Sequence, residues 1–229
     1  DYMVSNRWPY AFSILQILMK RRLLTASLFG PLVAWKMPAF AQDRPVEGRS
    51  YLVLQSRQPT RDAGKVEVLE FFAYSCGHCN AFEPMIDAWQ KKLPRDVLFR
   101  RIPVAFREDL VIHQKLYFAI EAMGLVEQLH PKVFAAIHAE RKKLDTPDQI
   151  GAFVAANGVD RVRFLQLLDS FGIVAKVKQA TALATGYAIE GTPSIGVNGR
   201  WLTSGSLAGS NSKSLSVAEY LLELARKGG

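Results

Sequence analysis

The sequence predicts an α/β fold in which a block of helices interrupts a small sheet. Residues 66–74 form an apolar run of strand-forming residues, and an amphipathic helical pattern follows them. From about residue 108 to 187 the apolar residues recur with a helical period. Strand character returns at 194–203, where two short runs flank a two-residue turn. The predicted order is therefore strand, helix, strand, helical block, hairpin and helix.

The first 41 residues resemble an export signal. Lys20-Arg21-Arg22 is a basic start, residues 23–35 are largely apolar, and Ala39-Phe40-Ala41 has the small residues of a cleavage site. We expect a signal peptide over 19–41, cleaved after Ala41, with an uncleaved membrane anchor as the alternative. Residues 1–18 are expected to be upstream read-through, with Met19 as the biological start.

The net charge of +8 does not indicate a polyanion partner. The first 41 residues hold five basic residues and one acidic residue, which leaves 24 basic against 20 acidic, or +4, in the remainder. This excess is mild and scattered, so we expect no nucleic-acid binding.

Elements before the helical block follow from local patterns. Residues 42–64 are expected to be loop, apart from a short strand at 51–54, and residues 97–104 to be a strand. Pro84 lies inside the helix that follows the first long strand and should kink it. The apolar residues of that helix recur on one face, which we expect to be buried: Ala81, Phe82, Met85, Ile86, Trp89 and Leu93.

Capping residues divide the helical block. Thr146 begins a helix that ends at Asn157-Gly158, and Asp160 begins the next. A last helix is expected over 174–187. The apolar positions expected to face inward are Leu116, Ile120, Met123, Val133, Phe134, Ile137, Ile150, Phe153, Val154, Val162, Leu165 and Leu168.

The C-terminal part is expected to form a hairpin and a helix. Asn198-Gly199 is a strong signal for a two-residue turn between antiparallel strands. Ser216-Val217-Ala218-Glu219 has the pattern of a capping box, which predicts a final helix starting there.

Cys76 and Cys79 are the only cysteines, and their spacing suits a dithiol that opens and closes. A strand places Cys76 at a helix N-terminus, where unpaired N–H groups and the helix dipole favour a thiolate. Cys79 lies one turn further in and is expected to be the less reactive thiol. His78 is expected to stabilise the Cys76 thiolate, which would make the disulfide oxidising. Gly77 leaves room for a substrate sulfur.

Two other uses of the pair are open. A structural disulfide with so short a loop would contribute little stability. A zinc site would need two more ligands, and His113, His130 and His138 show no paired motif. We therefore expect redox catalysis without a metal or cofactor.

The chain resembles the DsbA family of bacterial periplasmic thiol:disulfide oxidoreductases. The resemblance covers nearly the whole chain after the signal, and its most specific parts are Leu69-Glu70-Phe71-Phe72, Cys76-Gly77-His78-Cys79 and 191–199. It implies a thioredoxin fold over 42–107 and 187–229, with a helical insertion domain over 108–186. Gly77 departs from the proline that many members carry, so the strength of oxidation is open.

The resemblance also implies roles for single residues. Cys76 corresponds to the exposed nucleophile, Cys79 to its buried partner, and His78 to the residue that stabilises the thiolate. Thr192 and Pro193, with a cis bond between them, are implied to bind substrate peptide, and Gly77 borders the same site. Glu70 matches an acid that is buried beneath the active site in this family. A charged side chain in an apolar strand is costly unless it is paired or protonated, which suggests a role in moving protons near Cys79; the alternative is a solvated position at a sheet edge. Arg101 aligns with a basic partner of that acid, and Arg100 competes for the assignment.

We expect a monomeric periplasmic enzyme that donates its disulfide to folding secreted proteins with free thiols. The resemblance implies reoxidation by a DsbB-like, quinone-linked membrane protein. A disulfide isomerase or reductase of the same fold is the nearest alternative. A non-catalytic exported module that binds peptides is a more distant one.

Overall fold

The computed structural model describes residues 44–228, so the expected signal peptide, its cleavage site and residues 1–18 lie outside the described residues. A five-stranded sheet has the order β1-β5-β4-β2-β3. Strands β2 (Val66–Phe72) and β3 (Val97–Pro103) are parallel, and the other neighbours are antiparallel. The short β1 (Leu52–Val53) pairs with β5 (Trp201–Ser204).

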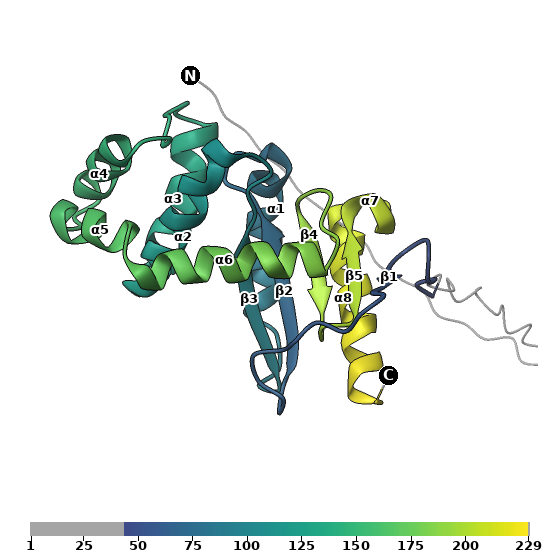
Figure 1. Cartoon of the computed structure of the whole chain (residues 1–229). Helices are drawn as coiled ribbons and strands as arrows, with labels where there is room; N and C mark the ends of the chain where they lie inside the picture. Colours follow the sequence, from purple (N-terminus) through teal and green to yellow (C-terminus); the bar gives the residue numbers. More distant parts are fainter. Residues whose placement is uncertain (1–43, 229) are drawn as a thin grey trace, which may run out of the picture. The chain divides into compact units, whose positions relative to one another are not determined.

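The helical block enters the chain between β3 and β4 (Ser194–Val197), as the sequence predicts. Figure 1 shows this block extending to one side of the sheet. It consists of a 3-10 turn at Glu108–Leu110 and five helices, namely α2 (Val111–Ala122), α3 (Val126–His138), α4 (Pro147–Ala156), α5 (Arg161–Leu168) and α6 (Phe171–Gly186).

Two apolar clusters join the elements. One cluster brings β2, β4 and β5 together with α1 (Gly77–Gln90) and α8 (Asn211–Arg226), and its aromatic members include Phe82 and Trp89. The other runs from β2 and Cys79 into the helical block. The first helix therefore has two buried faces, one toward α8 and one toward α3.

Local capping and turn chemistry agrees with the sequence. Thr146 and Asp160 accept hydrogen bonds from the N–H groups of Gln149 and Arg163 at the starts of α4 and α5. Asn198 and Gly199 have φ of 51° and 67°, which is the geometry of a type I′ turn.

Three predicted details are wrong. Met85 is 39% exposed, and Ala81 is also exposed. The second buried face of α1 carries Glu83 and does not include these two residues. Val162 is 66% exposed, and Phe164 takes the inward position in α5. The remaining predicted inward positions of the block are buried or half-buried.

The helix boundaries also differ at the end of the chain. The last helix starts at Asn211, capped by Ser210, and not at the Ser216 box. Glu219 accepts a hydrogen bond from the indole of Trp89 at 2.9 Å, which is a long-range contact that local sequence does not encode. A short helix, α7 (Gly205–Ala208), precedes the last helix. Helix α6 begins at Phe171, three residues earlier than expected.

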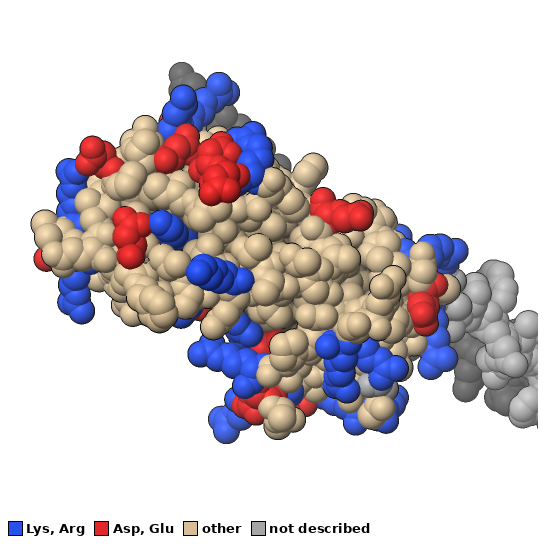
Figure 2. Space-filling model, in the orientation of Figure 1, with Lys and Arg blue, Asp and Glu red and all other residues tan. Residues whose placement is uncertain are grey.

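Charged side chains of both signs are interspersed on the face drawn in Figure 2, and uncharged side chains fill most of its centre. Within residues 44–228, no helix combines the length and the apolar character that crossing a membrane requires.

Candidate functional site

Cys76 is the N-cap residue of α1, directly after the strand β2 and a short turn. Its sulfur accepts a hydrogen bond from the main-chain N–H of Cys79 at 3.4 Å. Its thiol donates to the main-chain carbonyl of Thr192 at 3.3 Å. The sulfur is half-buried, and both cysteines are free thiols in this structure. A helix N-terminus and a second loop therefore hold one accessible sulfur between them.

The two sulfurs differ strongly in acidity. A hydrogen bond with the Cys79 thiol is the largest influence, and with Thr192 and the N–H groups of Cys79 and His78 it outweighs burial and lowers the pKa of Cys76 to about 5. The same bond and burial raise the pKa of Cys79, whose side chain has no exposed surface. At neutral pH the arrangement supports one thiolate and one thiol.

Thr192 and Pro193 lie opposite the cysteines in the loop that leads into β4. The bond between them is cis, which agrees with the family resemblance. The hydroxyl of Ser194 donates to the Gly191 carbonyl at 2.8 Å across this loop. The loop thus brings residues more than a hundred positions away in the sequence to the Cys76 sulfur.

His78 and Gly77 are both exposed in the first turn of α1. A Cβ built on Gly77 meets no atom within 4 Å, so the space expected beside the sulfur is present. In the described part of the chain no hydrogen bond joins the His78 imidazole to Cys76, and the contribution of His78 to the Cys76 pKa comes through its main-chain N–H. The imidazole's role stays a prediction.

Glu70 is fully buried in β2, so the alternative of a solvated edge position is wrong. The Arg101 guanidinium Nε lies 3.1 Å from Glu70 Oε2, and Arg101 faces Glu70 across the strand pair. Arg100 points elsewhere and pairs with Glu67 at 2.9 Å, which settles the choice between the two arginines. Burial and the charge of Glu83 raise the pKa of Glu70 to about 8, although Arg101 opposes them.

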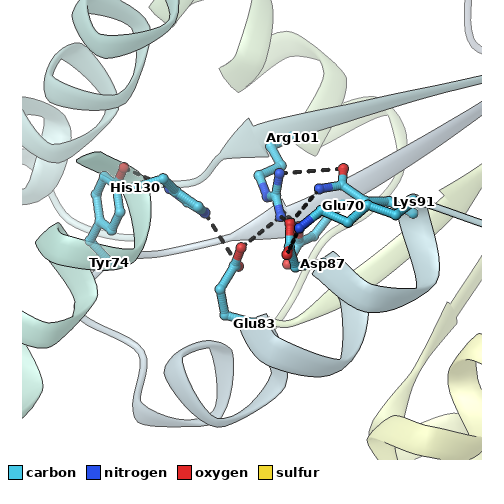
Figure 3. A network of polar contacts seen from close by, with 8 residues as sticks. Glu70, Tyr74, Glu83, Asp87, Lys91, Arg101 and His130 are labelled. Atoms are coloured by element: carbon cyan, nitrogen blue, oxygen red, sulfur yellow. Dashed lines mark hydrogen bonds and ion pairs between the residues drawn. The ribbon is translucent and has the colours of Figure 1, made fainter. Parts of the chain in front are cut away.

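Two buried polar residues next to Glu70 and Arg101, namely Glu83 and His130, are not among the site residues predicted from the sequence. Glu83 accepts a 2.6 Å hydrogen bond from Arg101 Nη2, and its other oxygen lies 3.2 Å from His130 Nε2. Figure 3 shows Tyr74, His130, Glu83 and Arg101 in a row that ends at Glu70. The missed signal was spacing, because Glu83 lies four residues after buried Cys79 and so shares its helix face.

The pKa values of Glu83 and His130 follow from the surroundings of these two residues. Burial raises the pKa of Glu83, but the contact with His130 and the charge of Arg101 outweigh it, so this pKa lies below its ordinary value. Burial lowers the pKa of His130, which keeps the imidazole neutral at pH 7.

No group of three or more His, Cys, Asp or Glu side chains within residues 44–228 is arranged to hold a metal ion. His113 Nε2 lies 3.3 Å from Asp145 Oδ1, and His138 Nε2 makes a 2.8 Å hydrogen bond with the Tyr74 carbonyl oxygen.

Family and sequence comparisons agree with the geometry. Residues 67–214 match the family model described as a DSBA-like thioredoxin domain. A thiol:disulfide interchange protein DsbA from Bordetella pertussis is 40% identical over 207 residues, covering 90% of this chain and 97% of the relative. The DsbA of Pseudomonas aeruginosa is 40% identical over 210 residues, covering 92% and 96%.

Solved structures give the same result. The crystal structure of Pseudomonas aeruginosa DsbA has a TM-score of 0.78 at 40% identity, over 80% of this chain and 95% of that one. The oxidoreductase DsbA from Xylella fastidiosa has a TM-score of 0.75 at 30% identity, over 80% and 99%.

Proposed function

The chain belongs to the DsbA family of thiol:disulfide interchange proteins, and from this premise we propose how its residues transfer a disulfide. It is a protein dithiol:disulfide oxidoreductase of the thioredoxin fold that donates its active-site disulfide to substrate proteins with thiols. The observation that carries the assignment of roles is the asymmetry of the two sulfurs. Cys76 is half-exposed with a lowered pKa, whereas Cys79 is buried with a raised one.

In the first step a substrate thiolate attacks the Cys76 sulfur of the oxidised enzyme. The Cys76–Cys79 bond breaks, its electron pair stays on Cys79, and a mixed disulfide forms between substrate and Cys76. Cys79 takes up a proton, as its raised pKa favours. Glu70 is the group proposed to move this proton, because a pKa of about 8 keeps it protonated at neutral pH.

In the second step another substrate thiolate attacks the substrate sulfur of the mixed disulfide. Cys76 leaves as a thiolate, which its low pKa makes a good leaving group. The substrate loses two electrons and gains a disulfide, and the enzyme is left as a dithiol. His78 is proposed to stabilise the Cys76 thiolate from the exposed side, and Gly77 to leave the approach open.

Thr192 and Pro193 are proposed to bind the substrate peptide beside Cys76. Support comes from the main-chain carbonyl oxygen of Thr192, which lies 3.3 Å from the Cys76 sulfur. A substrate that displaces this contact would place its own main chain at the loop that leads into β4.

Reoxidation follows transfer in this family, and we propose a DsbB-like, quinone-linked membrane oxidase as the partner. We place the enzyme in the periplasm, where it acts as a monomer on unfolded or folding secreted proteins. We also propose residues 42–107 and 187–229 as the thioredoxin-fold domain and 108–186 as the helical domain. These boundaries are supported by the position of helices α2 to α6, which all lie between β3 and β4 in the chain.

Trapping tests the assignment of the sulfurs. Cys79→Ser should accumulate covalent complexes with a reduced substrate protein, and Cys76→Ser should neither oxidise nor trap it. Non-reducing electrophoresis and mass spectrometry of the linked peptides measure both outcomes. Oxidase activity retained by the Cys76 variant, or trapping through Cys79, would overturn the assignment. A reduction potential near that of thioredoxin, about −270 mV, would support a reductase instead.

A further inference from the structure

His130 connects the helical block to the polar groups beneath the active site. It belongs to α3, and its two ring nitrogens face two other elements. Nδ1 lies 2.8 Å from the Tyr74 hydroxyl at the end of β2, and Nε2 lies 3.2 Å from Glu83 Oε2 in α1. The imidazole is buried, and within residues 44–228 neither Nε2 nor Glu83 Oε2 makes a hydrogen bond of good geometry, so the 3.2 Å contact is what joins the two atoms.

The contacts of the two ring nitrogens indicate the tautomer of His130. A neutral imidazole has one donor and one acceptor nitrogen. The ionised Glu83 can only accept, and the Tyr74 hydroxyl has no other hydrogen-bond partner within residues 44–228, so we assign the hydroxyl hydrogen to Nδ1 and the ring hydrogen to Nε2, the atom that faces Glu83. His130 thus offers Glu83 a donor while remaining neutral, which is the state that its burial favours.

Two buried carboxyl groups compete for Arg101. Its Nη2 donates to Glu83 at 2.6 Å, while its Nε lies 3.1 Å from Glu70 and forms no hydrogen bond of good geometry with it. Two carboxylates that share one cation in a buried site tend to retain a proton between them. Within residues 44–228, Glu83 has the 2.6 Å hydrogen bond from Arg101 and the 3.2 Å contact with His130, whereas Glu70 has the 3.1 Å contact with Arg101 and no second cation or donor. The proton therefore favours Glu70.

We propose that His130 is a positioning residue that assigns the shared proton of this carboxyl pair to Glu70, by holding Glu83 in its ionised form. The inference rests on the proposed role of Glu70 in proton movement. In this proposal His130, from the inserted helices, determines the protonation of Glu70, which lies on a strand of the thioredoxin fold.

The other groups around His130 are consistent with this role. Tyr117 of α2 packs against the ring at 5.6 Å between centroids, and Phe72 and Phe134 pack at 5.0 and 5.2 Å. The charged groups are Glu83 and Asp87 of α1 and Arg101 of β3. Among the carboxylates, Glu83 is the one in contact with Nε2.

A cavity of about 510 Å³ lies beside Glu83 and His130. Glu83, Asp87, Glu127, His130, Lys91 and Arg101 all line it.

The tautomer is tested first, in the unaltered reduced protein. Nitrogen-15 NMR that correlates ring nitrogens with ring protons distinguishes the two neutral forms. We expect His130 as the Nε2–H form at pH 7. The Nδ1–H form would leave Glu83 facing a lone pair and would overturn the inference. This measurement remains decisive where a variant does not fold.

The assignment of the proton is tested with three variants. In His130→Phe, Glu83 loses the donor that faces it and competes with Glu70 for the proton. The titration midpoint of Glu70 should therefore fall by about one pH unit, which is a tenfold change in the ratio of protonated to ionised Glu70. The protonated fraction of Glu70 at pH 7 would drop from about nine-tenths, given a midpoint of about 8, to about one half. Carbon-13 NMR of labelled glutamate side chains, assigned with Glu70→Gln, measures both.

His130→Gln and His138→Phe are the matched variants. Gln keeps a donor for Glu83 and an acceptor for Tyr74, so the Glu70 midpoint should stay within about 0.3 unit of the wild type. His138 lies on the same helix and also contacts Tyr74, but its partner is the main-chain carbonyl. His138→Phe should therefore leave Glu70 unchanged. Equal shifts in both Phe variants, or no shift in His130→Phe, would overturn the inference.

The activity of Glu70→Gln separates this inference from the function on which it rests. If Glu70→Gln transfers disulfides at the wild-type rate, the proposed proton role fails, although His130 still sets the Glu70 titration. If Glu70→Gln slows transfer and His130→Phe leaves the Glu70 midpoint unmoved, the inference about His130 fails alone.

Discussion

The pH dependence of the reduction potential tests the low pKa of Cys76. Reducing a disulfide to two thiols takes up two electrons and two protons, whereas reduction to one thiolate and one thiol takes up a single proton. Each proton coupled to two electrons shifts the potential by about 30 mV per pH unit. With the pKa of Cys76 at about 5 and that of Cys79 raised, the reduced enzyme holds one proton above pH 5.

The potential should therefore fall by about 60 mV between pH 5.5 and 7.5. An enzyme with two ordinary thiols would lose about 120 mV over the same range. The stability of the reduced protein also depends on pH through Cys76. Its folded pKa lies below the unfolded value, so the thiolate stabilises the fold above the unfolded pKa of about 8.5, and this stabilisation is lost as the pH falls through 5.

Equilibration with glutathione buffers at fixed pH, followed by acid quenching and alkylation, gives the potential. Thiolate absorbance near the ultraviolet limit gives the Cys76 midpoint independently, with Cys76→Ser as the blank. A slope near 60 mV per pH unit across the range, or an absorbance midpoint above 7, would refute the acidity that the helix N-terminus and the Cys79 hydrogen bonds predict.

Substitutions in the core test other parts of the structure, each by urea unfolding of the reduced protein. Arg101→Met leaves the buried, ionised Glu83 without its cation and should cost about 3–5 kcal/mol at pH 7 and less at lower pH, where Glu83 gains a proton; a loss under about 1 kcal/mol at pH 7 would contradict the buried pairing. Gly196→Ala would put a Cβ against the ring of Tyr187, closer than van der Waals contact, so we expect a loss of about 1–3 kcal/mol, and an unchanged midpoint would show that the ring moves freely. Tyr187→Phe removes the oxygen that accepts a main-chain N–H of the hairpin turn at 2.9 Å and should cost about 1–3 kcal/mol, unless another acceptor replaces it. Gly77→Ala is the control, because its Cβ meets open space and the substitution restricts the unfolded chain, so stability should rise by about 0.4–1 kcal/mol.

Local chemistry made much of the fold predictable from sequence. Asn198-Gly199 needs positive φ at both residues, and Thr146 and Asp160 cap helices through their own side chains. Cys76 at a helix start is equally local. For these positions a few neighbouring residues carry the whole physical cause, so no knowledge of the tertiary fold is needed.

The partners of Glu70 depended on tertiary packing instead. Glu83 was missed because a helical pattern is judged by its apolar residues, and a buried carboxylate becomes tolerable only when Arg101 arrives from β3. His130 is 60 positions from Glu70, and its placement requires α3 to pack beside α1. Val162 matched the helical period but faces solvent, since α5 buries Phe164 instead.

The shared guanidinium has a consequence for how these sequences diverge. Loss of Arg101 alone leaves two buried acids without their cation, and loss of either acid alone removes a partner of the buried guanidinium. A single substitution at Glu70, Glu83 or Arg101 is therefore a step through a disfavoured intermediate. Relatives that differ at one of the three should carry a compensating difference at a second, so the positions evolve as a linked set.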